Sequence, residues 1–266
     1  MHPILFHLGG LPIYTYGVQG ALGFIVVTLL VLRRSRALFL HRDKVIDVIF
    51  WTSITAMVGA RGVFVLQNLD AMQGVGDWVN IRAGGLVFYG ALLTGLPVGT
   101  LLVWRHKLPF YAFTDAVATA LPIGHGISRL GCLAAGCCYG TPTDLPWGVT
   151  YSHPLTDAPH GVALHPTQLY AALYLFAIGG ACTWLYPRKS FDGQVMLLYL
   201  VAYAVARSLN EMVRGDFERG WFLEGWLGQT LSTSQGLSIL LAVGAVVVFW
   251  WGARRARAAR AQKRGE

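Results

Sequence analysis

Residues 14–32 read YTYGVQGALGFIVVTLLVL, a run without a charged side chain that ends directly before Arg33 and Arg34. Its length approaches the roughly 20 residues with which an α-helix crosses the hydrocarbon core of a bilayer. The rest of the chain has a matching composition, because 55% of its 266 residues are hydrophobic and only 13% are charged. Soluble domains carry about 25% charged residues. Much of the surface is therefore expected to face lipid rather than water.

Six further apolar runs follow the first. A lone span in lipid has to satisfy its own backbone hydrogen bonds, which predicts helices rather than strands. The expected fold class is all-α, a polytopic membrane protein with about seven transmembrane helices. The predicted spans cover residues 14–32, 45–66, 84–104, 112–133, 167–186, 193–209 and 232–251. They form a single transmembrane domain over residues 1–252, followed by a basic tail over residues 253–266.

The basic residues predict how these spans are oriented. With seven spans, 15 of the 21 Lys and Arg residues lie in the tail and in the connections after spans one, three and five. No Lys or Arg lies between Leu130 and Pro187. Cytoplasmic loops carry the excess of basic residues, so the N-terminus is expected to be periplasmic and the C-terminus cytoplasmic. No cleavable signal peptide is expected, because residues 1–16 lack a basic region.

The net charge of +8 raises the question of nucleic acid as a partner. The basic residues cluster beside apolar runs, where anionic lipid headgroups would lie. No aromatic interleaving or folded basic domain accompanies them. The sequence therefore predicts membrane lipids as partners and no nucleic acid.

Six arginines do not follow the orientation pattern, because they lie within spans or at their outer ends. They are Arg61, Arg82, Arg129, Arg207, Arg214 and Arg219. Arginine at membrane depth is costly and normally faces a bundle interior with a partner. Each could pair with a nearby acid, as Arg214 could with Glu211 or Asp216. Several guanidinium groups converging near the outer leaflet would instead form a binding site for a phospholipid phosphate.

The most informative polar stretch is residues 122–140, PIGHGISRLGCLAAGCCYG. His125 and Arg129 are four residues apart, so on a helix they share one face. The surrounding glycines permit a broken or closely packed helix end, which can present backbone N–H groups to an anion. In the later stretch HPTQLY, residues 165–170, Pro166 can serve as the first residue of span five.

These stretches, in their order along the chain, resemble the prolipoprotein diacylglyceryl transferase family. The matching motifs are YTYG at 14–17, GARG at 59–62, GGLVFYG at 84–90, SRLG at 128–131, HPTQLY at 165–170, Arg207 with Glu211 and Arg214, and SQGLS at 234–238. The resemblance implies a seven-span transferase of the bacterial inner membrane. It would move the diacylglyceryl group of phosphatidylglycerol to the lipobox cysteine thiol of a prolipoprotein signal peptide, releasing glycerol phosphate. This chemistry requires no metal and no redox cofactor.

The resemblance also implies roles for single residues. Arg129 matches the motif arginine that is taken to bind the phospholipid phosphate. The other expected binding positions are Arg207, Arg214 and Gly140. The expected catalytic positions are Tyr16, Tyr89 and His125. The expected structural supports are Arg61, His165 and Glu211.

Tyr89 departs from the family pattern, in which a histidine discussed as the base for the thiol follows the Phe of the Gly-Gly motif. Tyrosine has a pKa of roughly 10 and is a poor base unless perturbed. One hypothesis is that His125 takes the proton instead, because it shares a helical face with Arg129. The alternative is that His125 is a structural hydrogen-bond partner. Three other departures are Cys132 for an Asn, Cys137 for an acidic residue and Ala171 for a Glu.

Three of the four cysteines, Cys132, Cys137 and Cys138, are expected near the outer surface, where oxidation is permitted. We interpret them as a structural disulfide between Cys132 and Cys137, or as buried thiols. A metal site that adds a histidine is a weaker alternative, because the spacing matches no closed zinc site well. The candidate histidines are His153, His160 and His165.

Two other functions compete with lipid-dependent thiol alkylation. Adjacent Cys137 and Cys138 could serve a membrane thiol–disulfide oxidoreductase. The arginines could instead belong to a non-catalytic lipid-binding or transport protein. A transporter would be favoured by inverted repeats, and the sequence shows none.

Overall fold

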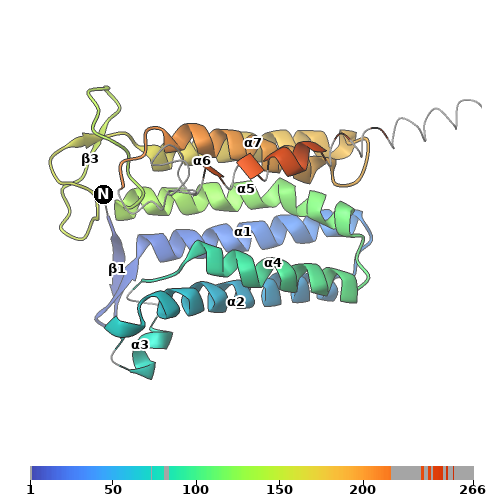
Figure 1. The fold of residues 1–266 in the computed structure, drawn as a ribbon, viewed down its shortest axis with the longest axis horizontal. Helices are drawn as coiled ribbons and strands as arrows, with labels where there is room; N and C mark the ends of the chain where they lie inside the picture. The colour runs from blue at the N-terminus through green and yellow to red at the C-terminus, as the bar shows by residue number, and fades with distance from the viewer. Residues whose placement is uncertain are drawn as a thin grey trace, which may run out of the picture. The chain divides into compact units, whose positions relative to one another are not determined.

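The computed structural model describes residues 2–72, 74–80 and 84–216, with short parts of the C-terminal segment at 235–236, 239–240, 242–247, 250 and 254. These residues are mostly helical (Figure 1). The long helices are α1 (Thr15–Ala37), α2 (Arg42–Gln67), α4 (Phe88–Arg105), α5 (Phe110–Ala135), α6 (Thr167–Leu185) and α7 (Gln194–Glu211). The short ones are η1 (Leu69–Ala71), α3 (Val75–Val79) and η3 (Tyr186–Arg188).

The six long helices coincide with the first six predicted spans to within a few residues. Among the described residues, three helical segments are long and apolar enough to cross a bilayer, namely Thr15–Ala37, Arg42–Gln67 and Thr167–Arg188. Helices α5 and α7 carry charged side chains such as Asp115, Arg129 and Arg207, which lower their mean hydropathy. The structure thus supports a helical membrane protein, while the count of seven spans and the orientation of the termini stay predictions. Most of the span at 232–251, the tail, Arg82 and Arg219 lie outside the described residues.

Two small β-sheets, which the sequence did not predict, accompany the helices. β1 (Ile4–Leu8) pairs antiparallel with β2 (Leu11–Tyr14), and β3 (Val149–Thr150) pairs antiparallel with β4 (Ala163–Leu164). The first hairpin turns at Gly9 and Gly10, both with positive φ. Strands this short leave no signal in a search for apolar runs of about 20 residues.

The described chain divides into two compact units, each considered by itself. One comprises Met1–Val31 and Thr114–Glu266, and the other comprises Leu32–Phe113. We call them the first and the second unit.

In the second unit, helices α2 and α4 pack against each other. A Cβ atom at Gly59 in α2 or at Gly90 in α4 would collide with the backbone of the other helix. Small residues at such a contact let two membrane helices approach closely, so that their backbones gain van der Waals contact. Glycine at these two positions therefore determines how closely the pair packs.

Arg61 of α2 holds the segment that connects α2 to α4 by hydrogen bonds to its backbone carbonyl groups. Its Nε donates to the carbonyl oxygen of Trp78 at 2.9 Å, its Nη1 donates to Gly84 and Gly85 at 2.6 and 3.0 Å, and its Nη2 donates to Asp77. The side chain is 9% exposed. A buried guanidinium needs such acceptors to offset its lost hydration. These bonds join α2 to the segment that leads into α4, and the structural role of Arg61 stays a prediction.

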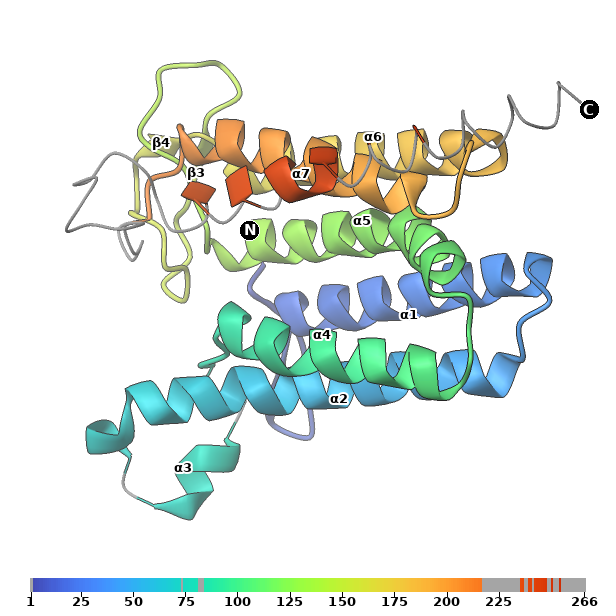
Figure 2. The same cartoon turned by 45° about the vertical axis from the view of Figure 1, so that its right-hand side comes forward.

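In the first unit, α5 lies between α1 and the pair α6–α7 (Figures 1 and 2). A Cβ at Gly124 of α5 would lie 2.7 Å from the carbonyl oxygen of Gly23 in α1, and one at Gly126 would lie 2.7 Å from the ring of Phe176 in α6. Both neighbours can thus approach α5 closely. The buried core beside these contacts consists of Ala118, Ile178, Cys182, Val195 and Tyr199. Arg129 lies on this tightly packed α5.

Asp115 joins α5 to the beginning of α7. Its Oδ1 accepts the backbone N–H groups of Val195 and Met196 at 2.9 and 3.0 Å, and its Oδ2 accepts that of Gly193 at 2.8 Å. Oδ2 also lies 2.8 Å from the ammonium group of Lys189. The carboxylate is fully buried and satisfies N–H groups that the first turn of a helix leaves without an intrahelical partner.

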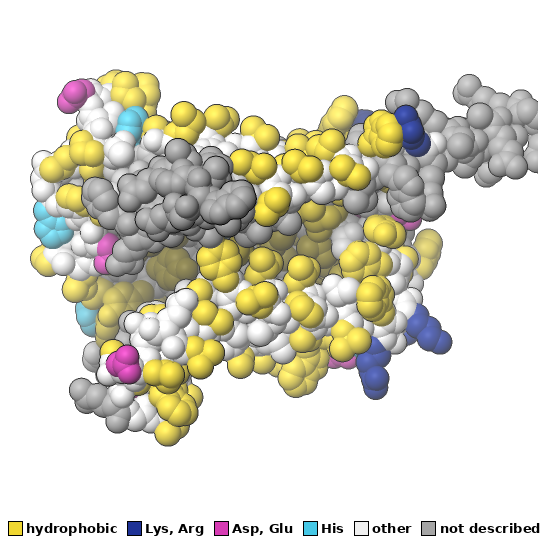
Figure 3. All heavy atoms as spheres, in the orientation of Figure 1, with side chains coloured by type: hydrophobic (Ala, Val, Ile, Leu, Met, Phe, Trp, Pro, Cys, Tyr) yellow, Lys and Arg dark blue, Asp and Glu magenta, His cyan; other side chains and the backbone are white. Residues whose placement is uncertain are grey.

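Large apolar side chains are exposed along the long helices, where they form much of the visible surface (Figure 3). Leu29 in α1, Leu93 in α4 and Trp184 in α6 are 61%, 71% and 63% exposed. Soluble proteins rarely expose large contiguous apolar patches, because their contact with water is unfavourable. Exposure of this kind agrees with helices that face lipid.

Candidate functional site

A small polar cavity lies among α5, α6 and α7 in the first unit. Its lining residues are Arg129, Cys138, Thr167, Gln168, Tyr174, Arg207, Asn210 and Arg214. Its volume is about 10 Å³. Arg129 of α5 therefore meets Arg207 and Arg214, which lie in α7 and just beyond its end. Guanidinium groups arranged in this way match the oxygens of a phosphate or carboxylate.

Arg129 and His125 share one face of α5, as their spacing predicts. Arg129 Nε lies 3.2 Å from His125 Nε2 and donates a hydrogen bond to it. His125 Nε2 is the acceptor, so its lone pair is already engaged. Within the described part of the chain, Arg129 forms no ion pair with a carboxylate. Its positive charge is the one in the cavity that no described carboxylate neutralises.

Arg207 and Arg214 are both paired with acids. Arg207 binds Glu211, one turn further along α7, and Glu211 is only 4% exposed. Arg214 places Nε and Nη2 on the two carboxylate oxygens of Asp216 at 2.6 and 2.7 Å. Burial by itself would lower the pKa of the Arg214 guanidinium. The hydrogen bonds to Asp216 have the larger effect and raise this pKa above its ordinary value. Acid pairing, one alternative left open by the sequence, therefore describes these two arginines.

Gly140 holds the backbone beside Arg214. It forms an antiparallel bridge with Arg214, and its N–H donates to the carbonyl oxygen of His165 at 3.0 Å. The flanking Thr141 N–H donates to the carbonyl oxygen of Val213 at 2.9 Å. A Cβ at Gly140 would lie 2.5 Å from the Cβ and the carbonyl oxygen of His165. The absence of a side chain is therefore what lets the segments approach so closely.

Replacing Gly140 by alanine is expected to push Arg214 out of position and to lower activity at least about tenfold. The reason is overpacking, which typically costs about 1–3 kcal/mol. Gly180→Ala is the matched control, because a Cβ at Gly180 meets nothing within 4 Å. Diacylglyceryl transfer and thermal unfolding should be measured for both variants in detergent. Equal activity of the two variants would contradict the positioning role of Gly140.

Two side-chain oxygens in the cavity wall lack a partner. Gln168 Oε1 and Asn210 Oδ1 are buried, and no described residue donates a hydrogen bond to either. Their amide nitrogens are engaged, because Gln168 Nε2 donates to the carbonyl oxygen of Cys137 at 2.7 Å and Asn210 Nδ2 donates to that of Thr167 at 3.3 Å. These bonds fix which way both amides point. The cavity therefore offers two acceptors for hydroxyl groups as well as arginine donors for an anion.

Comparison with known proteins identifies the family. A family model described as prolipoprotein diacylglyceryl transferase matches residues 3–251. This chain belongs to the prolipoprotein diacylglyceryl transferase family. The resemblance inferred from the sequence motifs is thereby confirmed, and the protein is a transferase.

Curated relatives agree over almost their whole length. A protein named phosphatidylglycerol–prolipoprotein diacylglyceryl transferase from Clostridium tetani is 30% identical over 249 residues, covering 94% of this chain and 97% of the relative. The Legionella pneumophila strain Paris protein of the same name is 32% identical over 267 residues, covering 96% of this chain and 98% of the relative. A Clostridium perfringens protein with that name and the number 2 is 31% identical over 250 residues, covering 94% of each chain.

Three cysteines converge beside the cavity of this diacylglyceryl transferase. The sulfur atoms of Cys132, Cys137 and Cys138 all lie within 4.8 Å of one another. All three are free thiols, as is Cys182. The structure therefore has free thiols, of which Cys132 is buried and Cys137 and Cys138 are half-buried, and no disulfide joins Cys132 to Cys137.

The environment of these thiols makes Cys138 the most acidic. Hydrogen bonds from Cys132 and Cys137 lower the pKa of Cys138, and nearby Arg214 and Arg129 add to this effect against the opposing influence of burial. The same thiol contacts raise the pKa of Cys137. Among the described residues no histidine joins the three sulfurs. His160 instead lies 3.1 Å from Thr156, and His165 lies 3.3 Å from Tyr170.

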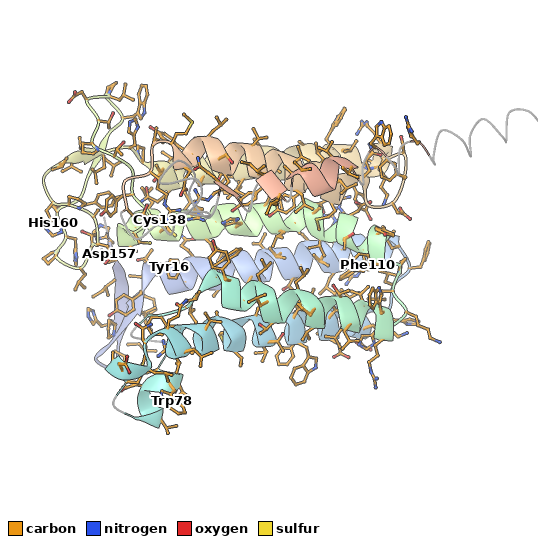
Figure 4. All side chains as sticks on the ribbon, in the orientation of Figure 1. Tyr16, Trp78, Phe110, Cys138, Asp157 and His160 are labelled. Carbon is orange, nitrogen blue, oxygen red and sulfur yellow. The ribbon has the colours of Figure 1, made fainter. Side chains whose placement is uncertain are left out.

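The remaining predicted residues fall in two places. Tyr16 is the second residue of α1 in the first unit and lies near the same end of the helices as Cys138 (Figure 4). Its backbone packs against Gly131. Its hydroxyl interacts electrostatically with Arg129 and the three cysteines. Tyr89 belongs to the second unit, where it is 40% exposed and its ring contacts Phe88. His165 does not line the cavity, and its backbone supports Gly140.

Proposed function

We propose that this transferase moves the diacylglyceryl group of phosphatidylglycerol to the lipobox cysteine thiol of prolipoproteins and releases glycerol phosphate. The names of the relatives support the lipid and the protein substrate. The proposal places the chain in the bacterial inner membrane with seven spans, a periplasmic N-terminus and a cytoplasmic C-terminus. The distribution of Lys and Arg supports this orientation.

The observation that carries the proposal is the uncompensated charge of Arg129 in the cavity. Among the described residues around the cavity, three guanidinium groups face the two carboxylates of Glu211 and Asp216, which leaves one positive charge in excess. A phosphodiester carries one negative charge and complements this excess. Arg129 is therefore the group that we assign to the phosphate, with Arg207 and Arg214 held beside it by their acids.

The two unpartnered amide oxygens support a headgroup that carries hydroxyls. An unsatisfied buried acceptor costs roughly 1–3 kcal/mol, which a hydroxyl donor would recover. The glycerol headgroup of phosphatidylglycerol has two hydroxyl groups. We assign Gln168 Oε1 and Asn210 Oδ1 as their acceptors.

The chemistry needs stabilisation of a leaving group. The thiol loses its proton, its sulfur forms a C–S bond to the diacylglyceryl carbon, and the C–O bond from that carbon to the phosphate breaks. Glycerol phosphate leaves with the bonding electron pair, so negative charge grows on the phosphate during the reaction. Fixed guanidinium groups near that oxygen stabilise the growing charge most effectively where water is scarce.

His125 is proposed to position Arg129 rather than to take the thiol proton. Its Nε2 already accepts the hydrogen bond from Arg129. His125→Gln should then keep activity within about tenfold of the native chain, because an amide oxygen can accept the same N–H, whereas His125→Ala should lose more. A general base contributes about 10²–10⁴-fold, so a loss of that size in both variants would restore the base hypothesis.

The competing base is Tyr89, and one experiment separates the two residues. The pH dependence of kcat/KM should be compared between Tyr89→Phe, His125→Gln and the native chain. Loss of the rising limb, on which kcat/KM increases with pH as the base is deprotonated, in one variant alone identifies the proton acceptor. An unchanged profile in Tyr89→Phe removes Tyr89 from the catalytic positions.

The proposed function itself is tested by mass spectrometry of a lipobox peptide. Purified protein is incubated with the peptide and phosphatidylglycerol, and the peptide should gain the mass of a diacylglyceryl group. A peptide with serine in place of the lipobox cysteine is the control and should gain nothing. Binding of the lipid without a mass change would instead support a lipid-binding scaffold. Thiol–disulfide exchange that requires Cys137 and Cys138 would support an oxidoreductase.

A further inference from the structure

We propose that Cys132, Cys137 and Cys138 form a three-thiolate site for a soft monovalent metal ion of the Cu(I) class, set in the wall of the arginine cavity. The site is separate from the transfer reaction proposed above and does not depend on it.

The distances fit three-coordinate binding. Metal–sulfur bonds of about 2.3 Å in a trigonal plane place the sulfurs about 4 Å apart. The three sulfurs already lie within 4.8 Å of one another, so a small closure suffices. Soft thiolate ligands select Cu(I) over hard cations. A closed zinc site needs a fourth ligand, and no described histidine or carboxylate joins the three cysteines.

The backbone holds the two adjacent thiols in place before any ion binds. Gly136 and Cys138 both have positive φ, at +75° and +58°. Such a φ is uncommon for a residue with a side chain and persists only where its surroundings enforce it. Here α6 holds the backbone in this conformation through two hydrogen bonds. Gln168 Nε2 donates to the carbonyl oxygen of Cys137 at 2.7 Å, and Thr167 Oγ1 donates to that of Cys138 at 2.6 Å.

The surrounding charge complements the loaded site. Three thiolates and one monovalent cation leave two negative charges. Arg129 and Arg214 both act electrostatically on Cys138, and Cys138 shares the cavity wall with them. Arg129 would therefore offset one of these two negative charges, because Arg214 is already paired with Asp216. Metal binding would also disfavour the binding of an anion in the cavity, because the negative metal–thiolate group would engage the positive charge of Arg129.

The site is tested by competition for Cu(I) with a chromogenic chelator. The reduced full-length protein in detergent, without oxygen, should withdraw one Cu(I) per chain from the chelator. Cys132→Ser, Cys137→Ser and Cys138→Ser should each weaken this binding by more than the roughly 10–100-fold typical for loss of a supporting residue at a metal site. Cys182→Ser is the matched control, because Cys182 is a buried free thiol outside the cluster, and it should bind as the native chain does.

Three results would overturn the proposal. The chelator could keep all of the metal in the presence of the native chain. Cys182→Ser could lose as much binding as the cluster variants. Protein whose thiols are alkylated before isolation could contain a disulfide within the cluster. Thermal unfolding of each variant without metal identifies one that fails to fold, and the half-buried Cys137 then provides the mildest substitution.

Discussion

Replacing Arg129 by alanine is expected to lower kcat/KM for diacylglyceryl transfer by about 10²–10³-fold, as for the loss of one donor to a developing oxyanion. Arg129 is the cavity guanidinium without a described carboxylate partner. Its removal therefore takes away the charge that we assign to the phosphate. The measurement is the rate of mass gain of a lipobox peptide at several concentrations of phosphatidylglycerol.

Two further variants make this result specific. Arg129→Lys keeps the charge but loses the planar fork that matches two phosphate oxygens, so its activity should lie between those of the native chain and Arg129→Ala. Arg105→Ala removes an exposed arginine at the end of α4 and should leave the rate unchanged. Native activity in Arg129→Ala would exclude it as the phosphate ligand.

Replacing Asp115 by asparagine is expected to lower the free energy of unfolding by about 3–5 kcal/mol, the range for breaking a buried ion pair from one side. The change removes the charge that neutralises Lys189 and leaves an amide NH₂ where two oxygens accept four hydrogen bonds. The measurement is a denaturant titration of the native chain and of Asp115→Asn in mixed micelles.

Asp192→Asn is the matched control for Asp115. Asp192 also lies 2.8 Å from Lys189, but its side chain is 59% exposed, so its loss should change stability by less than about 1 kcal/mol. Burial opposes the charge of Lys189, yet its bonds to both acids raise its pKa above the ordinary 10.5. The resulting stabilisation is complete below that ordinary pKa and is lost as the pH rises through the folded value. Titrations near pH 7 therefore measure it in full, and equal stability of the two variants would contradict the role of Asp115.

Helices and local pairs were predictable from the sequence because their signals are local. Apolar runs located α1, α2, α4, α5, α6 and α7 to within a few residues. The four-residue spacing of His125 and Arg129 predicted a shared face, and the two side chains are in contact. The cost of isolated arginines at membrane depth predicted either acid pairs or converging guanidinium groups, and Arg129, Arg207 and Arg214 line one cavity.

Contacts between residues far apart in the sequence were not predictable, because no local sequence pattern indicates them. Asp115 caps a helix whose first residue is Gln194, and no spacing rule connects positions so far apart. The thiol cluster depends on a left-handed backbone conformation at Cys138. This conformation could not be predicted from the sequence, because it is uncommon for residues other than glycine. The two amide oxygens in the cavity wall could not be predicted, because Gln168 and Asn210 lie in apolar helices. Hydrogen bonds to carbonyl groups far away in the sequence set the orientation of both amides.

The joint at Asp115 also implies an order of assembly during synthesis. The ribosome completes α5 long before it adds Lys189 and the first turn of α7. Until then the Asp115 carboxylate has neither its cation nor the N–H groups that it accepts in the finished protein. Burial without them would be unfavourable, so this end of α5 stays in water until α7 arrives. Insertion of α6 and α7 therefore brings together the residues that line the arginine cavity.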